Sequence, residues 1–416
     1  MYHINADSLC VRAEQKKHIH IALFLYWAAL VVLQNIGAYT ARTTIDIVLK
    51  MFLLLWIVGW YLYSFQNARM RPGRLFLFSL FAIFQFFSFC SEETLGVNLI
   101  VSYVFPLLFL FLTFVYGYNC TIDKKQYVTF LNCVIAVVAY AAIYAIVFKS
   151  DQFLSAFTIT SAYGNELSSF FVSSHEYAMY LLGGIIACIV CLEVKHKDAS
   201  PKKYIYFVCL ILFVPNLILT FSRTTLLALA VFLLVYVLFR GTSKMRVAIV
   251  VCLLAFVLLF LIWDEFNVFV LKIVLKGNDA AGRDELYALA RDYFDEGNIW
   301  QKLFGRGITN TEEYFRVQTR HSDVHNAYLQ ILLSYGLVGL GFMIGFLVNR
   351  LIAAIKLLKR DYFVGVLLIG LLSACVMLML TNTSILFNSP IDSFFLTVFT
   401  IVIPKYLENG IYAYAK

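Results

Sequence analysis

Long apolar runs separated by short polar segments dominate the sequence. A helix needs about 20 mostly apolar residues to cross a hydrocarbon core of roughly 30 Å. Runs of this kind predict twelve transmembrane helices, near residues 19–38, 44–65, 75–90, 97–116, 127–148, 176–193, 204–221, 224–240, 247–263, 326–349, 363–381 and 393–407. The pattern therefore predicts an all-α polytopic membrane protein with a single membrane domain that covers residues 1–416.

Two long polar segments interrupt this pattern. One runs from Lys149 to about His175, and the other, residues 264–325, is the longest polar stretch of the chain. Inside the second segment, apolar residues recur at helical spacing with charges between them, namely Leu286, Leu289, Ala290, Tyr293 and Phe294. This spacing predicts an amphipathic helix that lies either on the membrane surface or over the bundle. Residues 303–308, LFGRGI, are typical of a turn.

Composition and charge exclude a soluble protein. The chain is 62% hydrophobic and 14% charged, whereas soluble domains are about a quarter charged. On the twelve-span topology, the side that holds both termini carries 21 of the 33 basic residues but 7 of the 25 acidic ones. Such a bias predicts cytoplasmic termini and an extracytoplasmic segment 264–325. The net charge of +8 thus indicates orientation and not a nucleic-acid partner.

The nine cysteines do not indicate a disulfide framework or a metal site. They are scattered mostly through the predicted spans. Cys188 and Cys191 form a CxxC pair inside an apolar helix, but the sequence has no second pair, and a structural zinc ion takes four ligands. A role in helix packing is the better interpretation for both.

The most informative polar residues lie where the long loop becomes a span, at His325 and Asn326. A neutral histidine accepts a proton near ambient pH, so this one is a candidate general base. The alternative is a histidine that caps the helix or lies in the membrane interface. His321 and His325, with Asp323 between them, have the spacing of a two-ligand metal face, but no third ligand is evident. Glycines in the span that follows, with a GxxxG spacing at Gly341 and Gly345, predict close approach by another helix.

Three further residues are candidates for binding a charged ligand. Arg223 lies in a very short extracytoplasmic loop, where an arginine either pairs with an anion or extends to the lipid headgroups. Guanidinium groups bind phosphate oxygens in a bidentate manner, so a lipid-linked phosphate is a suitable partner. Arg283 opens the amphipathic helix and, taken alone, is a solvated residue. His175 opens the span 176–193, where it either lines the same cavity as the other candidate residues or simply begins the helix.

These motifs together resemble one family. HNAYLQILLSYGLVG, residues 325–339, fits the H-N-x9-G-x-x-G signature of the O-antigen ligase and O-antigen polymerase (Wzy-type) superfamily. SRTTLLAL after a span, the long outer loop, and its GRD and LFGRG segments are also similar to that family. The resemblance covers roughly residues 170–350.

The resemblance implies a glycan transferase of the bacterial plasma membrane. Its donor is an undecaprenyl-diphosphate-linked oligosaccharide, and a glycan acceptor attacks at the outer face. His325 corresponds to the base, while Arg223 and Arg283 correspond to the diphosphate ligands; Asn326, His321 and His175 are further expected substrate contacts. Arginines in place of a metal ion stabilise the leaving group. The resemblance therefore implies no cofactor, no metal and inversion at the anomeric carbon.

Three functions stay open at this point. The first is a polymerase of O-antigen, capsule or exopolysaccharide repeat units, and the second is a ligase that moves finished glycan onto lipid A-core. The third is a lipid-linked saccharide flippase or transporter. The span interiors are almost uncharged and the polar residues gather on one side, which favours a one-sided site over an alternating pathway. The expected partners are the lipid bilayer, a flippase and a chain-length regulator protein.

Overall fold

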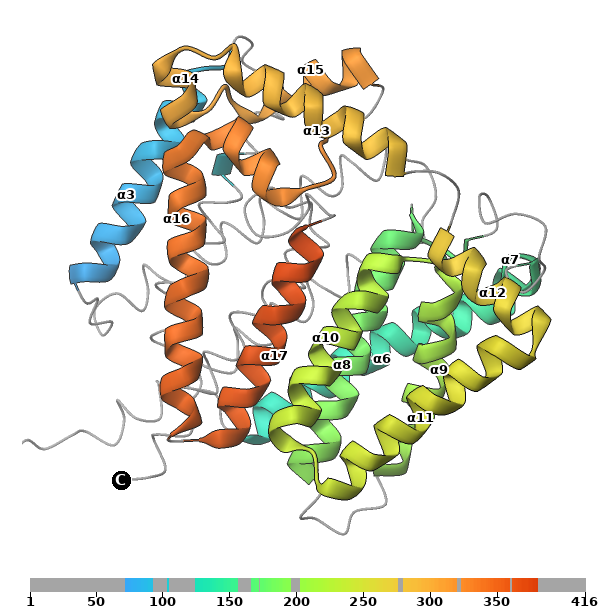
Figure 1. The fold of residues 1–416 in the computed structure, drawn as a ribbon. Coiled ribbons are helices and arrows are strands. Elements are labelled where there is room, and N and C mark those ends of the chain that lie inside the picture. Colours follow the sequence, from blue (N-terminus) through green and yellow to red (C-terminus); the bar gives the residue numbers. More distant parts are fainter. Residues whose placement is uncertain are drawn as a thin grey trace, which may run out of the picture.

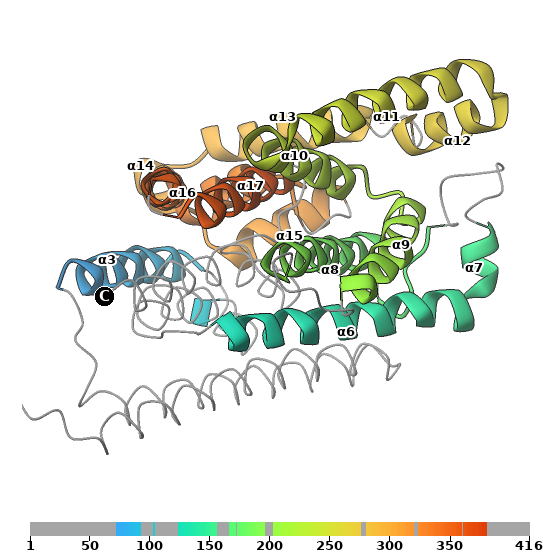
Figure 2. The same cartoon turned by 90° about the horizontal axis from the view of Figure 1, so that it is seen from below.

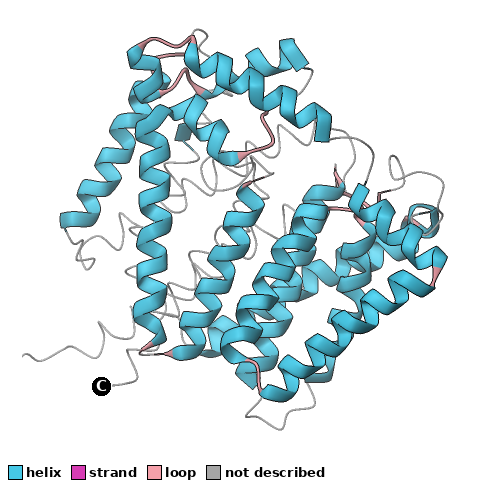
Figure 3. Ribbon diagram, in the orientation of Figure 1, coloured by secondary structure: helices cyan, strands magenta, loops and turns pink. Residues whose placement is uncertain are grey.

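The computed structural model describes residues 72–92, 103–104, 124–155, 166–171, 173–195, 203–275, 280–319, 323–359 and 361–380. The described residues are helices joined by short loops and turns, with no strand among them (Figure 3). The predicted spans near 19–38, 44–65 and 393–407 lie outside these ranges, as do all but two residues of 97–116. His321 lies outside them as well.

The described helices carry the labels of Figure 1. They are α3 (Pro72–Phe89), α6 (Lys124–Phe148), α7 (Ser150–Ser155), α8 (Ser174–Lys195), α9 (Lys203–Leu219), α10 (Arg223–Arg240), α11 (Ser243–Ile262), α12 (Asp264–Leu275), α13 (Ala280–Asp295), α14 (Ile299–Phe304), α15 (Ile308–Thr319), α16 (Ala327–Leu358) and α17 (Tyr362–Met379). Each predicted span within the described ranges coincides with one of these helices, and α12 to α15 occupy the long polar segment.

Five of the described helices are long and apolar enough to cross a membrane: α6, α8, α10, α16 and α17. Two shorter apolar helices, α3 and α9, accompany them. The chain is therefore a membrane protein. The total of twelve spans stays a prediction, because several of the predicted spans fall outside the described ranges.

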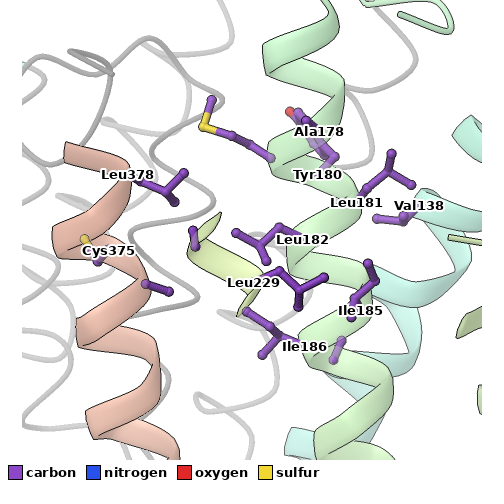
Figure 4. Close-up of a cluster of buried hydrophobic side chains, with 14 of the residues drawn as sticks. Val138, Ala178, Tyr180, Leu181, Leu182, Ile185, Ile186, Leu229, Cys375 and Leu378 are labelled. Carbon is purple, nitrogen blue, oxygen red and sulfur yellow. The ribbon is translucent and has the colours of Figure 1, made fainter. Parts of the chain in front are cut away.

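The apolar helices form a bundle in which α17 packs between α16 and α10, and α8 packs against α6 and α9 (Figure 1 and Figure 2). Figure 4 shows part of the buried core between α8, α10 and α17. Leu229 of α10 lies beside Leu182 of α8, and Leu378 of α17 points toward them. All three side chains are buried. Cys188 and Cys191 are buried free thiols of α8, which agrees with the predicted packing role.

The helices α13, α14 and α15 gather at one end of the bundle, called the loop end below (Figure 1). The apolar face predicted for the amphipathic helix is the buried face of α13. This face packs in a small core, which consists of Leu286, Ala290 and Tyr293 of α13, Phe315 of α15, Val324 of the connection before α16, and Leu333 of α16. The apolar face of α13 thus packs against α15 and the start of α16.

Two glycines allow α14 and α16 to touch at the level of the backbone. The helical geometry of α16 is interrupted at Gly336, whose φ of 69° lies in the left-handed region. A Cβ atom at Gly336 would lie 2.3 Å from the carbonyl carbon of Leu303, and one at Gly305 would lie 2.1 Å from the carbonyl oxygen of Ser334. Only glycine tolerates both the conformation and the contact.

The kink at Gly336 exposes helix carbonyls that the turn after α14 then uses. The backbone N–H of Arg306 donates to Leu333 O (2.9 Å), and that of Gly307 donates to Ser334 O (3.2 Å). The segment predicted as a turn is therefore part of the packing of α16. At Gly341 and Gly345, no atom of the described residues lies within 4 Å of where a Cβ would be, so the close helix approach predicted for them stays a prediction.

Candidate functional site

His325 lies in the short connection between α15 and α16, at the loop end. Its φ of 52° is in the left-handed region, which is uncommon for residues other than glycine. Its side chain remains 40% exposed. Val324, the preceding residue, is fully buried, and its backbone N–H donates to the buried Oε1 of Gln330 (3.3 Å). The connection therefore fixes the backbone of His325 while the imidazole stays accessible.

Asn326 is the N-cap of α16. Its side-chain oxygen accepts hydrogen bonds from the backbone N–H groups of Tyr328 (3.0 Å) and Leu329 (3.2 Å). These are two of the donors that a helix start leaves without a partner. The cap is therefore Asn326 and not His325, which removes one alternative interpretation of the histidine. Because the side-chain oxygen of Asn326 caps the helix, the predicted substrate contact would be made by its amide nitrogen.

One carboxylate oxygen approaches His325 in two ways. Asp323 Oδ1 accepts a hydrogen bond from the backbone N–H of His325 (2.9 Å) and lies 2.8 Å from the Nδ1 atom of the same residue. In the sequence, Asp323 stands two residues before His325, but this spacing suggested only a possible metal site and not a contact between the two side chains. Only the left-handed turn at His325 reveals that the two side chains face each other.

The predicted residues His175 and Arg223 lie at neighbouring helix starts. His175 is the second residue of α8, and Arg223 is the first residue of α10. The Nδ1 atom of His175 lies 3.1 Å from the hydroxyl of Ser222, which in turn lies 2.9 Å from the hydroxyl of Thr225. His175 is exposed and Arg223 is half-buried. The structure thus joins these two predicted sites through one serine.

A strained residue also precedes Arg223. Phe221 has a φ of 51° and is completely buried. Among the described residues, the non-glycine residues with positive φ are Phe221, His325 and Ser169. Strained backbone of this kind clusters at functional sites, where the surrounding packing holds it. Of these three residues, His325 is itself a predicted site residue, and Phe221 lies two residues before Arg223. The sequence did not predict the positive φ of either.

The arginines of the long loop differ in their surroundings. Arg283 lies in the first turn of α13 and is half-buried, while Arg291 on the same helix is exposed. The guanidinium carbon of Arg306 lies 4.0 Å from the ring centre of Tyr293, a cation–π contact inside the loop. Arg320 lies outside the described residues. Arg306 therefore serves the packing of the loop, which its position in LFGRG did not indicate.

Glu312 is an acidic group that the sequence interpretation missed. It lies on α15 next to buried Thr311, and burial raises the pKa of its carboxyl to about 7. Smaller contributions to the same pKa come from Arg316, which lowers it, and from Asp323 and Glu92, which raise it. The helical spacing of Ile308, Thr311 and Phe315 would have placed Glu312 beside the buried face of α15. Glu312 therefore interacts electrostatically with Asp323, the residue whose carboxylate approaches His325.

Glu92, three residues after the end of α3, links the start of α15 to the bundle. Its carboxylate accepts hydrogen bonds from the backbone N–H groups of Thr309 (2.9 Å) and Asn310 (3.1 Å). Burial raises the pKa of Glu92, and the hydrogen bonds from Thr309 and Asn310 lower it. A carboxylate at a helix start also interacts favourably with the helix dipole.

The starts of α8, α10 and α16 all lie toward the loop end (Figure 1), so His175, Arg223 and His325 share one side of the bundle. Arg283 lies on the same side in α13. No group of three or more His, Cys, Asp or Glu side chains that could hold a metal ion occurs in the part of the chain that the structure describes.

Residues 205–344 match the family model described as O-antigen ligase. The matched range runs from α9 into α16 and contains Arg223, Arg283 and His325, whereas His175 lies before it. No curated protein matches the chain.

Proposed function

We propose that this membrane protein, which residues 205–344 place in the superfamily of O-antigen ligases and polymerases, joins saccharide repeat units into a polysaccharide. The donor is an undecaprenyl-diphosphate-linked oligosaccharide, and the product is O-antigen, capsule or exopolysaccharide. The observation that carries the proposal is His325, an exposed imidazole on a fixed backbone at the loop end. In this proposal the reaction takes place at the outer face of the bacterial plasma membrane.

His325 acts as the general base. One ring nitrogen takes the proton of an acceptor hydroxyl, and the acceptor oxygen then attacks the anomeric carbon of the donor sugar. The bond from this carbon to the diphosphate breaks as the new glycosidic bond forms. Attack in line with the departing diphosphate inverts the anomeric carbon. Asn326, His321 and His175 are proposed to contact the saccharides around this centre.

Positive groups stabilise the departing diphosphate. Arg223 and Arg283 supply two guanidinium groups, which bind phosphate oxygens in a bidentate manner. The starts of α8, α10 and α16 lie on the same side of the bundle, and helix starts carry partial positive charge. Stabilisation of a developing anion by fixed positive groups is a large catalytic effect and needs no metal ion. The proposed reaction is therefore independent of metals and cofactors.

The topology follows from the same proposal. Both termini are cytoplasmic, the segment 264–325 is extracytoplasmic, and residues 1–416 form one membrane domain. A site at the ends of membrane helices suits a donor whose lipid tail stays in the bilayer. A flippase that delivers the donor and a chain-length regulator are the proposed protein partners. Nucleic acid plays no part in this function.

A second candidate function is the transfer of finished glycan to lipid A-core. The description of the matched family model, O-antigen ligase, favours it. Ligase and polymerase use the same end of the donor and differ in the acceptor. The residues proposed for catalysis and for diphosphate binding are therefore the same in both functions.

Glycan analysis of a deletion strain separates these functions. The strain is complemented with wild type, His325→Ala, Arg223→Ala or the control Arg291→Ala, and membrane levels of each variant are matched. For a polymerase, wild type and control restore long chains, while the two site variants leave a single repeat unit on the carrier or its acceptor. A ligase is indicated if the deletion strain accumulates full-length polymer on undecaprenyl diphosphate. Wild-type glycan from both site variants would overturn the proposed site.

A further inference from the structure

The carboxylate of Asp323 and the imidazole of His325 form a preformed pair. Asp323 Oδ1 lies 2.8 Å from His325 Nδ1 and also accepts the backbone N–H of His325 at 2.9 Å. The second contact matters because it fixes the carboxylate relative to the peptide that carries the imidazole. The distance between the two side chains therefore does not depend on two independent rotamers.

The immediate surroundings hold this pair in place. His325 adopts a left-handed backbone conformation, with a φ of 52°. Val324, between the two residues, is completely buried, and its N–H donates to the completely buried side chain of Gln330. On the other side, Asn326 caps α16. Each residue next to His325 thus has a defined anchor, while the imidazole is 40% exposed and the carboxylate of Asp323 is 31% exposed.

The arrangement selects one form of the neutral imidazole. A neutral histidine carries its proton on either Nδ1 or Nε2, and an ionised carboxylate can only accept hydrogen bonds. A carboxylate oxygen 2.8 Å from Nδ1 therefore favours the proton on Nδ1 and leaves the lone pair on Nε2. When Nε2 takes a proton from a hydroxyl, the same carboxylate stabilises the resulting imidazolium.

We propose that Asp323 is the positioning residue of His325: it orients the imidazole and holds the Nδ1 proton, so that Nε2 alone faces the acceptor hydroxyl. This proposal rests on the proposed function, because it assigns a partner to the proposed base. The proton of the acceptor moves to Nε2, the acceptor oxygen bonds to the anomeric carbon, and the diphosphate departs with the electron pair of the broken bond. Asp323 does not itself gain a proton.

The test uses purified full-length protein and the lipid-linked repeat unit extracted from the deletion strain. Initial rates of undecaprenyl diphosphate release are measured for wild type, Asp323→Asn, Asp323→Glu, His325→Ala and the double variant Asp323→Asn/His325→Ala. The control Asp292→Asn changes an exposed carboxylate of α13. Thermal unfolding in detergent is recorded for each variant.

Asp323→Asn is expected to lower kcat by about 10²-fold or more, with the KM for the lipid-linked donor unchanged, because orienting carboxylates act on the chemical step. Asp323→Glu is expected to restore part of kcat. In the His325→Ala background, Asp323→Asn is expected to cause no further loss, since residues that act as a unit are not additive. A merely structural role would instead lower the unfolding temperature and add its loss to that of His325→Ala.

The outcomes separate this proposal from the proposed function. If His325→Ala keeps wild-type activity, the assignment of the base fails, and the role of Asp323 fails with it. If His325→Ala is inactive but Asp323→Asn stays within twofold of wild type, the base stands and the positioning role is overturned. The positioning role is likewise overturned if Asp323→Asn changes only KM. If Asp323→Asn does not accumulate, the comparison of kcat and KM for Asp323→Glu decides in its place.

Discussion

The backbone of Leu303 occupies the space that a side chain at Gly336 would need. A Cβ atom there would lie 2.3 Å from the carbonyl carbon of Leu303, and Gly336 itself has a φ of 69°. The kink at this glycine lets the N–H of Arg306 reach the carbonyl of Leu333. The glycine of the histidine signature thus fixes the long loop onto the helix that His325 precedes.

Gly336→Ala is expected to disrupt this junction. The substitution combines a left-handed residue with a backbone overlap, and strain of this kind costs on the order of 1–3 kcal/mol from the conformation alone. We expect a lower unfolding temperature in detergent and a lower membrane yield. Gly341→Ala is the matched control, because no described atom lies within 4 Å of a Cβ at that position. Equal behaviour of the two variants would contradict the role given to the kink.

Glu312→Gln is expected to stabilise the protein in a pH-dependent way. The carboxyl has an ordinary pKa of 4.5 and a folded-state pKa of about 7, raised chiefly by burial. Below 4.5 both states are protonated, and as pH rises from 4.5 to 7 the unfolded state loses its proton first, so wild-type stability falls. Glutamine does not titrate and avoids this loss, which is at most about 3 kcal/mol.

The measurement for Glu312→Gln is the unfolding temperature of variant and wild type in detergent between pH 4.5 and 8. The difference is expected to grow up to about pH 7 and then to stay constant. Glu313→Gln, an exposed position on the same helix, serves as the control with a flat difference. A difference for Glu312→Gln that shrinks as pH rises would show that the carboxylate form is the stabilised one.

Glu92→Ala is expected to loosen the start of α15. The substitution removes the acceptor of the N–H groups of Thr309 and Asn310, and the loss of a helix cap costs typically about 1 kcal/mol. Hydrogen exchange of the first turn of α15 should become faster, while that of α17 should not change. Glu313→Ala on the same helix provides the comparison. Unchanged exchange at Thr309 and Asn310 would contradict the capping role.

Arg283→Ala is expected to weaken donor use, and Arg291→Ala is expected to leave it near wild type. Both arginines belong to α13, but Arg283 is half-buried at its start and Arg291 is exposed. A hydrogen bond to a charged group contributes about 1.5–3 kcal/mol, so kcat/KM should fall about 10- to 100-fold for Arg283→Ala. Steady-state rates with the extracted lipid-linked donor test this. If Arg291→Ala lowered kcat/KM more than Arg283→Ala does, Arg291 and not Arg283 would be the proposed diphosphate ligand.

The apolar helices could be predicted from the sequence because their signal is local. Runs such as 224–240 and 363–381 correspond to α10 and α17, since a membrane span needs only length and apolar composition. The buried face of α13 was also predictable, because Leu286 and Tyr293 recur at helical spacing. The surface that this face covers could not be predicted, because it includes Phe315 and Leu333, which lie further along the chain.

In the candidate site, too, local features could be predicted from the sequence, and contacts that depend on the fold could not. The position of His325 at a helix start followed from the sequence, but its partner did not, because the approach of Asp323 depends on a positive φ that no local pattern predicted. The contact of His175 with Ser222 joins two residues that are 47 positions apart in sequence. The close contact with the backbone of α14 at Gly336 did not follow from the sequence either, because it depends on a left-handed conformation inside an apolar helix.

The release of undecaprenyl diphosphate by purified His325→Gly measures most simply whether His325 performs the chemical step. Glycine suits the left-handed conformation at this position, so the fold should be kept or slightly stabilised. We expect an unfolding temperature at or above that of wild type, together with a rate lower by at least about 10²-fold, the usual minimum for loss of a general base. A folded His325→Gly variant that releases undecaprenyl diphosphate at the wild-type rate would contradict the role of His325 as the base.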